Sequence, residues 1–196
     1  MTGSGHVESP RDQHATAEVA DAIRLAGQRV VVMGVSSSGK STVGKMLAER
    51  LGVEYADADD FHSADNRKKM SAGIALTDTD RLPWLHSIGD WLATRRQEGA
   101  VVTCSALKRS HRDVLRGHAE GLWLLHLSGS AELIEERMAG REGHFMPASL
   151  LRSQFEELEP PESDERAITE ETSKPPDEIV ARFMAGAVRR IGGTDA

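Results

Sequence analysis

The segment from Gly34 to Ser41, which reads GVSSSGKS, has the residue types and spacing of a phosphate-binding loop. It matches the pattern G-x-x-x-x-G-K-[ST], in which the backbone N–H groups of small residues surround the phosphates of a nucleotide. A helix that starts at this loop would add unsatisfied N–H donors and positive dipole character. Lys40 is expected to reach the β- and γ-phosphates, and the Ser41 hydroxyl is expected to bind Mg²⁺. The sequence therefore predicts an ATP·Mg site with these nucleotide-binding residues: Gly34, Ser36, Ser37, Ser38, Gly39, Lys40, Ser41 and Thr42.

Three acids follow the next predicted strand, within the segment DADDFH at residues 57–62. Open α/β sheets bind their ligands at the carboxyl ends of the strands, so these acids are expected beside the phosphate site. Asp57 is positioned to support Mg²⁺, through water or through Ser41. Asp59 is expected to orient an acceptor hydroxyl and to accept its proton. The alternative is a solvated acidic turn that caps the next helix, and the neighbouring phosphate-binding loop favours the functional interpretation.

Basic side chains that could hold an anionic acceptor occur in two segments after these acids. Lys69 lies in NRKKMSAG, and Arg81 in DTDRLPWL could pair with a carboxylate through both of its amino groups. Pro83 suits the first turn of a helix, with Asp80 or Arg81 near the cap. Taken singly, each basic residue is more often a solvated surface residue.

The segment CSALKR at residues 104–109 follows another apolar run, which lacks the terminal Asp of the usual Walker B strand. Metal support is therefore assigned to Asp57. Ser105 and Lys108 are expected at a strand-to-helix turn on the same rim as the phosphate-binding loop. Cys104 is interpreted as a small buried residue rather than a nucleophile.

Residues 137–147, RMAGREGHFMP, join a predicted helix to a connector that contains glycines. Arginines flanked by glycines suit a mobile lid that closes over ATP and excludes water, and the alternative is an ordinary basic turn after a helix. His144 lies in this lid, as His62 lies in the acidic segment. The eight histidines show no H-x-x-H or H-x-x-x-H spacing that would indicate zinc.

The composition excludes several classes of protein. A net charge of −7 argues against a nucleic-acid partner, which usually requires a basic field. The single cysteine cannot form an internal disulfide, which fits a reducing compartment such as the cytoplasm. No stretch approaches 18 apolar residues and the N-terminus has no apolar signal region, so we expect neither a membrane span nor a signal peptide.

Apolar runs alternate with helical patterns along the chain, which predicts a three-layer α/β/α fold around a central parallel sheet. The strands are expected at residues 29–33, 53–56, 100–104 and 122–127, with a late strand near 167–168. The helices are expected at residues 40–51, 83–97, 108–116, 131–138, 148–158 and 177–190. Residues 1–26 are expected to be a partly disordered N-terminal extension that ends in a short helix before Gly27. Residues 27–193 are then one domain, with the lid around 137–147.

Together these segments resemble the gluconate kinase (gluconokinase) family of small-molecule kinases. The matching segments run in family order and are MGVSSSGKST, DADDFH, NRKKMSAGIALTDTDRLPWL, CSALKRSHRDVLR, GREGHFMP and QFEELEP. The phosphate-binding loop is shared by many families, whereas DRLPWL, CSALKR with its downstream RDVLR, and GHFMP are far more specific. Ser37 departs from the family, because many members have glycine there, and the loop tolerates serine if the φ angle at Ser37 is negative.

The resemblance implies transfer of the γ-phosphate of ATP to the 6-hydroxyl of D-gluconate, giving 6-phospho-D-gluconate and ADP. It also implies a fold like that of shikimate kinase, a mobile lid, and a homodimer. The catalytic residues it implies are Lys40, Asp59 and Arg141, with Arg137 added to the nucleotide site. The expected substrate-binding residues are Asp59, His62, Lys69, Arg81, Ser105, Lys108 and His144, and the expected metal-site residues are Ser41 and Asp57.

Three other functions remain open at this stage. The nearest is another small-molecule kinase, such as a shikimate kinase or a kinase of another sugar acid. A nucleoside-monophosphate kinase is the second. The third is a nucleotide-gated binding module that hydrolyses ATP slowly, although such a module would not need an acidic acceptor segment.

Overall fold

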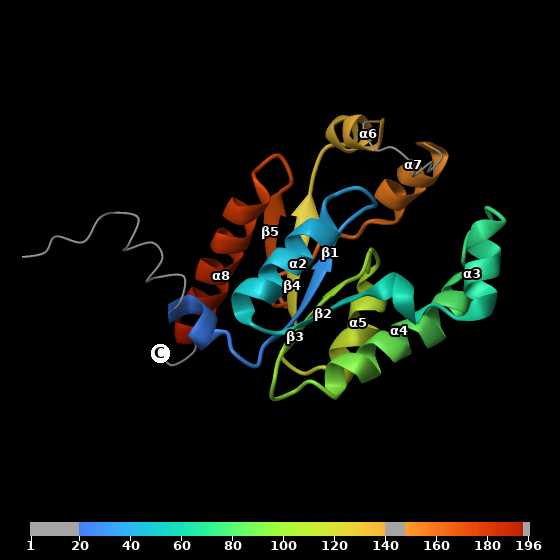
Figure 1. Cartoon of the computed structure of the whole chain (residues 1–196). Coiled ribbons are helices and arrows are strands. Elements are labelled where there is room, and N and C mark those ends of the chain that lie inside the picture. Colours follow the sequence, from blue (N-terminus) through green and yellow to red (C-terminus); the bar gives the residue numbers. More distant parts are fainter. Residues whose placement is uncertain (1–19, 140–147, 194–196) are drawn as a thin grey trace, which may run out of the picture.

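The computed structural model describes residues 20–139 and 148–193, which form a five-stranded parallel sheet with helices on both faces (Figure 1). The strand order is β2-β3-β1-β4-β5. The strands are β1 (Arg29–Met33), β2 (Glu54–Asp57), β3 (Ala100–Thr103), β4 (Trp123–Ser128) and β5 (Ala167–Glu171). All four strand pairs are parallel. The predicted α/β class and the parallel sheet are therefore confirmed.

Strand β1 lies at the centre of the sheet because four of its five residues are apolar and three of them are β-branched valines. Val30, Val31, Val32 and Met33 are at most 1% exposed, as expected for a strand covered on both faces. Their side chains alternate between two cores, Val30 and Val32 on one face and Val31 and Met33 on the other. A buried central strand gives the loop that follows it a fixed starting point.

The two faces of the sheet are covered by different pairs of helices. On one face, α2 (Lys40–Leu51) and α8 (Pro176–Gly192) bury Leu47 and Phe183. On the other face, α4 (Asp78–Ala93) and α5 (Arg109–His118) bury Ile88 and Leu115. The three layers predicted from the sequence are present (Figure 1).

Four shorter elements stand outside these layers. The 3₁₀ helix η1 (Ala58–Phe61) and the helix α3 (Ala64–Ser71) follow β2. The helices α6 (Ala131–Ala139) and α7 (Ala148–Glu157) follow β4. Figure 1 shows α6 and α7 at the end of the sheet towards which β1 and β4 point, while α3 projects beyond α4. These elements therefore gather around the carboxyl ends of the strands.

Two expectations for the elements were wrong. Helix α4 starts at Asp78 rather than Pro83, because Thr77 and Asp80 form a capping box one turn earlier, and Pro83 lies inside the helix. Helix α3 was not predicted at all, since the sequence ADNRKKMS has no apolar stripe. The short helix expected before Gly27 is present at residues 20–24, and the disorder expected for residues 1–13 falls outside the described residues. Within the described ranges, no helix is long and apolar enough to cross a membrane.

His126 is a buried titratable group in β4. It is 3% exposed and its Nδ1 lies 3.3 Å from Thr169 Oγ1, while its Nε2 has no hydrogen-bond partner. Burial, assisted by the positive charge of Arg112, lowers the pKa of His126 to about 4. The folded protein therefore keeps this imidazole neutral at pH values where an unfolded chain would protonate it.

We expect His126 to make the folded state sensitive to acid. Because its folded pKa is depressed, its contribution to stability is present above about pH 6.5 and is lost as the pH falls towards 4. Between pH 7 and pH 5 the loss should be about 2 kcal/mol, and His126→Asn should remove it. Urea unfolding of both proteins at the two pH values measures this. An equal pH dependence in wild type and variant would contradict the expectation.

Candidate active site

The loop between β1 and α2 has the backbone geometry of a phosphate-binding loop. Gly34 has φ +142°, and a Cβ there would lie 2.6 Å from the carbonyl oxygen of Leu127, so only glycine fits. Gly39 has φ +95° and is the N-cap of α2, without a side-chain cap. Lys40 Nζ donates to the carbonyl oxygens of Gly34 and Val35, at 3.0 and 2.8 Å. The lysine is therefore folded back along its own loop, where the phosphates are expected to bind.

Ser37 occupies a left-handed backbone conformation in this loop. Its φ is +61°, so the negative φ under which serine was expected to be tolerated is not adopted. A side chain in this region costs about 1–2 kcal/mol, which glycine avoids. The departure from glycine at this position is therefore a strained one.

We expect Ser37→Gly to stabilise the protein by roughly 0.5–1 kcal/mol, because strain relief exceeds the extra flexibility of glycine in the unfolded chain. Ser36→Gly is the matched control, because Ser36 is not among the residues with positive φ. This variant should be less stable than the wild type by roughly 0.5–1 kcal/mol. Chemical denaturation without nucleotide measures both variants. Destabilisation by Ser37→Gly would show that the hydroxyl compensates for the strain.

The structure brings together the two residues predicted for the metal site. Ser41 Oγ, at the start of α2, lies 3.3 Å from Asp57 Oδ2 at the end of β2. The Tyr55 hydroxyl donates to the same carboxylate oxygen at 3.3 Å and lies 3.1 Å from Thr103 Oγ1. Hydroxyl and carboxylate oxygens are the ligands that Mg²⁺ prefers, so this pair fits the ion that ATP carries. Tyr55 was not predicted; it lies on the same strand as Asp57 and links that carboxylate to Thr103 of the neighbouring strand β3.

Asp59 lies two residues further on, in η1, where its N–H donates to Asp57 Oδ1 at 3.2 Å. Its side chain is 87% exposed. Desolvation by the surrounding protein, followed by the negative charge of Asp57, raises the pKa of Asp59, while the charges of His62 and Lys40 act in the opposite direction. An exposed carboxylate with a raised pKa, within the field of the phosphate-binding lysine, is suited to accept a proton.

His62 is held rigidly behind Asp59. It is 5% exposed and stacks on Trp84 with 4.5 Å between ring centroids, and its Nε2 lies 3.9 Å from Asp59 Oδ1. Burial lowers the pKa of His62. The Trp84 indole in turn donates to the carbonyl oxygen of Ala58 at 2.6 Å. The stack fixes η1, and with it Asp59, against α4.

Each of the three basic residues that are predicted to bind the acceptor forms an ion pair with an acidic side chain. Lys69 Nζ lies 2.7 Å from Asp80 Oδ1, and Lys108 Nζ lies 2.9 Å from Asp78 Oδ2. Arg81 contacts Asp78 and Glu157, at 3.6 and 3.3 Å. The hydrogen bond from Lys69, together with one from the backbone N–H of Thr77, lowers the pKa of Asp80 to about 2. These acids hold the cations in place on α3, α4 and the start of α5.

Two further predicted site residues, Ser105 and Arg137, lie in the described part of the chain, and Cys104 was predicted to be a packing residue next to Ser105. The carbonyl oxygen of Ser105 accepts from Gly34 N–H at 3.5 Å, so the β3–α5 turn touches the phosphate-binding loop. The Arg137 guanidinium donates to the carbonyl oxygen of Thr172, between β5 and α8. Burial raises the pKa of the Cys104 thiol to about 12, which agrees with a packing role. Arg141, His144 and most of the expected lid lie outside the described residues.

Two residues of α7 that were not predicted also reach the site. Gln154 Oε1 accepts from the N–H of Ser36 at 2.6 Å, and Glu157 pairs with Arg81. These contacts join segments 118 and 76 residues apart in the sequence. No local spacing could have indicated them.

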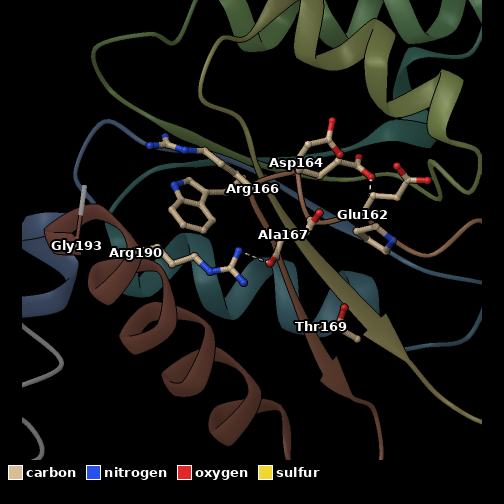
Figure 2. Close-up of a pocket in the computed structure, with 11 residues that line it drawn as sticks. Glu162, Asp164, Arg166, Ala167, Thr169, Arg190 and Gly193 are labelled. Atoms are coloured by element: carbon tan, nitrogen blue, oxygen red, sulfur yellow. Dashed lines mark hydrogen bonds between the residues drawn. The ribbon is translucent and has the colours of Figure 1, made fainter. Parts of the chain in front are cut away.

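A separate open pocket of about 640 Å³ lies at the opposite edge of the sheet, at the amino ends of β4 and β5. Figure 2 shows it between the segment that carries Glu162, Asp164 and Arg166 and the end of α8 at Arg190 and Gly193. None of the residues that line it is a predicted site residue. The predicted site residues that the structure describes lie around the carboxyl ends of the strands instead, where the phosphate-binding loop follows β1.

The family model described as shikimate kinase matches residues 36–186. Among relatives, the gluconokinase of Gluconobacter oxydans (strain 621H) is 47% identical over 162 residues, covering 80% of this chain and 91% of that protein. The thermosensitive gluconokinase of Escherichia coli (strain K12) is 45% identical over 146 residues, covering 74% and 78% of the two chains.

Solved structures agree with this similarity. A gluconokinase from Sinorhizobium meliloti 1021 superposes with a TM-score of 0.76 at 48% identity, covering 84% of this chain and 93% of that one. A shikimate kinase from Aquifex aeolicus has a TM-score of 0.56 at 17% identity, covering 85% and 99%. At that identity, the second likeness shows a shared fold alone.

Proposed function

This chain belongs to the gluconokinase family, and from that membership we propose that it transfers the γ-phosphate of ATP to the 6-hydroxyl of D-gluconate. The products are 6-phospho-D-gluconate and ADP. The observation that carries the proposal is the placement of Asp59 two residues from Asp57, whose carboxylate contacts Ser41 of the phosphate-binding loop. A proton acceptor for a hydroxyl thus stands beside a donor site for ATP.

In the proposed reaction, the Asp59 carboxylate accepts the proton of the 6-hydroxyl as its oxygen attacks the γ-phosphorus. The bond between the γ-phosphorus and the bridging oxygen breaks, and ADP leaves. Lys40 stabilises charge on the phosphates, and we assign the same task to Arg141 from the lid around residues 137–147. Arg137 would contribute to the nucleotide side.

The remaining predicted residues would bind the acceptor. We propose that Lys69, Arg81 and Lys108 supply the positive charge for its carboxylate, and that Ser105, His62 and His144 contact its hydroxyls. Ser41 and Asp57 would hold Mg²⁺, because their oxygens already lie within 3.3 Å of each other. When bound, Mg²⁺ neutralises charge on the phosphates.

We further propose that residues 27–193 form the kinase domain and that the protein works as a homodimer in the cytoplasm. The single cysteine supports a reducing compartment, since it is buried and holds its proton. Sedimentation of the purified protein tests the dimer.

One experiment separates the candidate functions. ADP release is followed with D-gluconate, shikimate, glycerate, gluconolactone and AMP as separate acceptors. We expect turnover with gluconate. Turnover with shikimate or AMP, and none with gluconate, would overturn the proposal.

A further inference from the structure

Helix α7 presents one stripe of side chains to both halves of the site. Leu151, Gln154 and Glu157 are spaced three residues apart, so each lies next to the following one on the surface of the helix. Leu151 is 1% exposed and packs in a cluster with Val35 of the phosphate-binding loop and Leu107 of the β3–α5 turn. The helix is therefore docked directly on the loop that is expected to bind ATP.

Two polar side chains of α7 form hydrogen bonds with groups that are expected to bind the nucleotide or the acceptor. Gln154 Oε1 accepts from the N–H of Ser36 at 2.6 Å, and backbone N–H groups of this loop are the expected phosphate ligands. Glu157 Oε2 accepts from Arg81 at 3.3 Å, and Arg81 is an expected ligand of the acceptor. Helix α7 thus places the Gln154 oxygen where a phosphate oxygen is expected to bind, and the Glu157 carboxylate where the anion of the acceptor is expected to bind.

The chain after α7 is held in place. The N–H of Glu159 donates to the carbonyl oxygen of Leu107 at 2.9 Å, and the Glu159 carboxylate accepts from the N–H of Arg109. These bonds fix the carboxyl end of the helix to the start of α5. Movement of α7 would therefore pivot at Glu159 and separate the Gln154 and Glu157 contacts together.

We propose that Gln154 is a positioning residue that couples nucleotide binding to acceptor binding through α7. The inference rests on the proposed function for the identity of the acceptor. A phosphate on the Ser36 N–H displaces Gln154, and an anion on Arg81 displaces Glu157. Because both contacts hold the same rigid helix, the ligand that binds first removes part of the cost of moving α7 for the second. The result is positive coupling between the two sites.

The size of the coupling follows from the contact that the nucleotide removes. A hydrogen bond of this kind changes an equilibrium by roughly fivefold. A non-hydrolysable ATP analogue with Mg²⁺ should therefore tighten gluconate binding to the wild-type protein about fivefold, and gluconate should tighten binding of the analogue by the same factor. Titration calorimetry in both orders measures the two values.

Gln154→Met is the decisive variant, because methionine keeps the length of the side chain and removes the acceptor oxygen. We expect it to bind gluconate about fivefold more tightly than the wild type in the absence of nucleotide, with little further gain when the analogue is added. Damage to the fold would weaken binding, so a gain in affinity cannot be produced by a merely structural role. Arg152→Met and Glu156→Gln, on exposed positions of the same helix, are controls that should retain the wild-type coupling.

Two results would overturn the inference. One is wild-type coupling in Gln154→Met, and the other is a variant whose main defect is weaker binding of the ATP analogue. Failure of the proposed function gives a different result, because the wild-type protein itself would then not bind gluconate.

Discussion

Asp59→Asn is expected to lower kcat with gluconate by about 10²–10⁴-fold, the range that a general base contributes. The substitution keeps the size of the side chain and removes its ability to take the proton of the acceptor hydroxyl. The affinity for ATP should change by less than about threefold, because the predicted nucleotide contacts come from the phosphate-binding loop and Lys40. Steady-state kinetics and titration with a non-hydrolysable ATP analogue measure the two quantities separately.

Asp60→Asn is the matched control for this prediction, because Asp60 is the exposed neighbour of Asp59 on the same 3₁₀ helix. It should retain activity within a fewfold of the wild type. Unchanged turnover in Asp59→Asn would move the role of base to another group. An equal loss in both variants would show that the acidic turn acts only through its total charge.

The pH dependence of the wild-type enzyme gives a second test of the same residue. Desolvation and the charge of Asp57 raise the pKa of Asp59, and a base must be deprotonated to act. Activity should therefore be lost on the acid side, as the pH falls through this raised pKa. The residual activity of Asp59→Asn should lack that acid limb.

Local sequence was sufficient to predict the local structure around the residues that are expected to bind ATP. The helix expected at residues 40–51 is α2 with the same limits, because glycine at 39 and at 52 marks both of its ends. Asp57 lies beside Ser41 as expected, since all strands of a parallel sheet have their carboxyl ends at one edge, although β3 separates β2 from β1. In both cases the information lies within a few residues of the feature that it predicts.

Tertiary contacts decided the features that were missed. Helix α3 has no apolar stripe, and it is held by the Ser63 cap and by Asn66 Nδ2, which donates to the carbonyl oxygen of Asp80 at 2.9 Å. The contact of Gln154 with Ser36 joins two ends of the domain. The positive φ angle of Ser37 depends on the path of the whole loop between β1 and α2, and the residue type alone does not predict it.

Arg112 is a fully buried charge on α5, next to the turn that carries two of the predicted acceptor-binding residues. Its side chain and that of Glu165 are both 0% exposed, and the two pair through Nε–Oε1 and Nη2–Oε2 contacts of 2.7 and 2.8 Å. Arg112 Nη1 also donates to the carbonyl oxygens of Leu107 and Glu159, at 3.1 and 2.9 Å. One guanidinium therefore joins α5 to the turn that carries Ser105 and Lys108 and to the segment after α7.

We expect Arg112→Met to destabilise the protein by about 3–5 kcal/mol, because it leaves the Glu165 carboxylate buried without its partner. Arg112→Lys keeps the charge but cannot form the bidentate contact with Glu165, so the free energy of unfolding should fall by about 1–3 kcal/mol. Arg116→Met, one turn along α5 on a half-buried ion pair, should cost less than about 1 kcal/mol. Urea unfolding gives the order of the three, and an Arg112→Met protein no less stable than Arg116→Met would show that the buried pair adds nothing. Should Arg112→Met not fold, the gap between Arg112→Lys and Arg116→Met decides the same question.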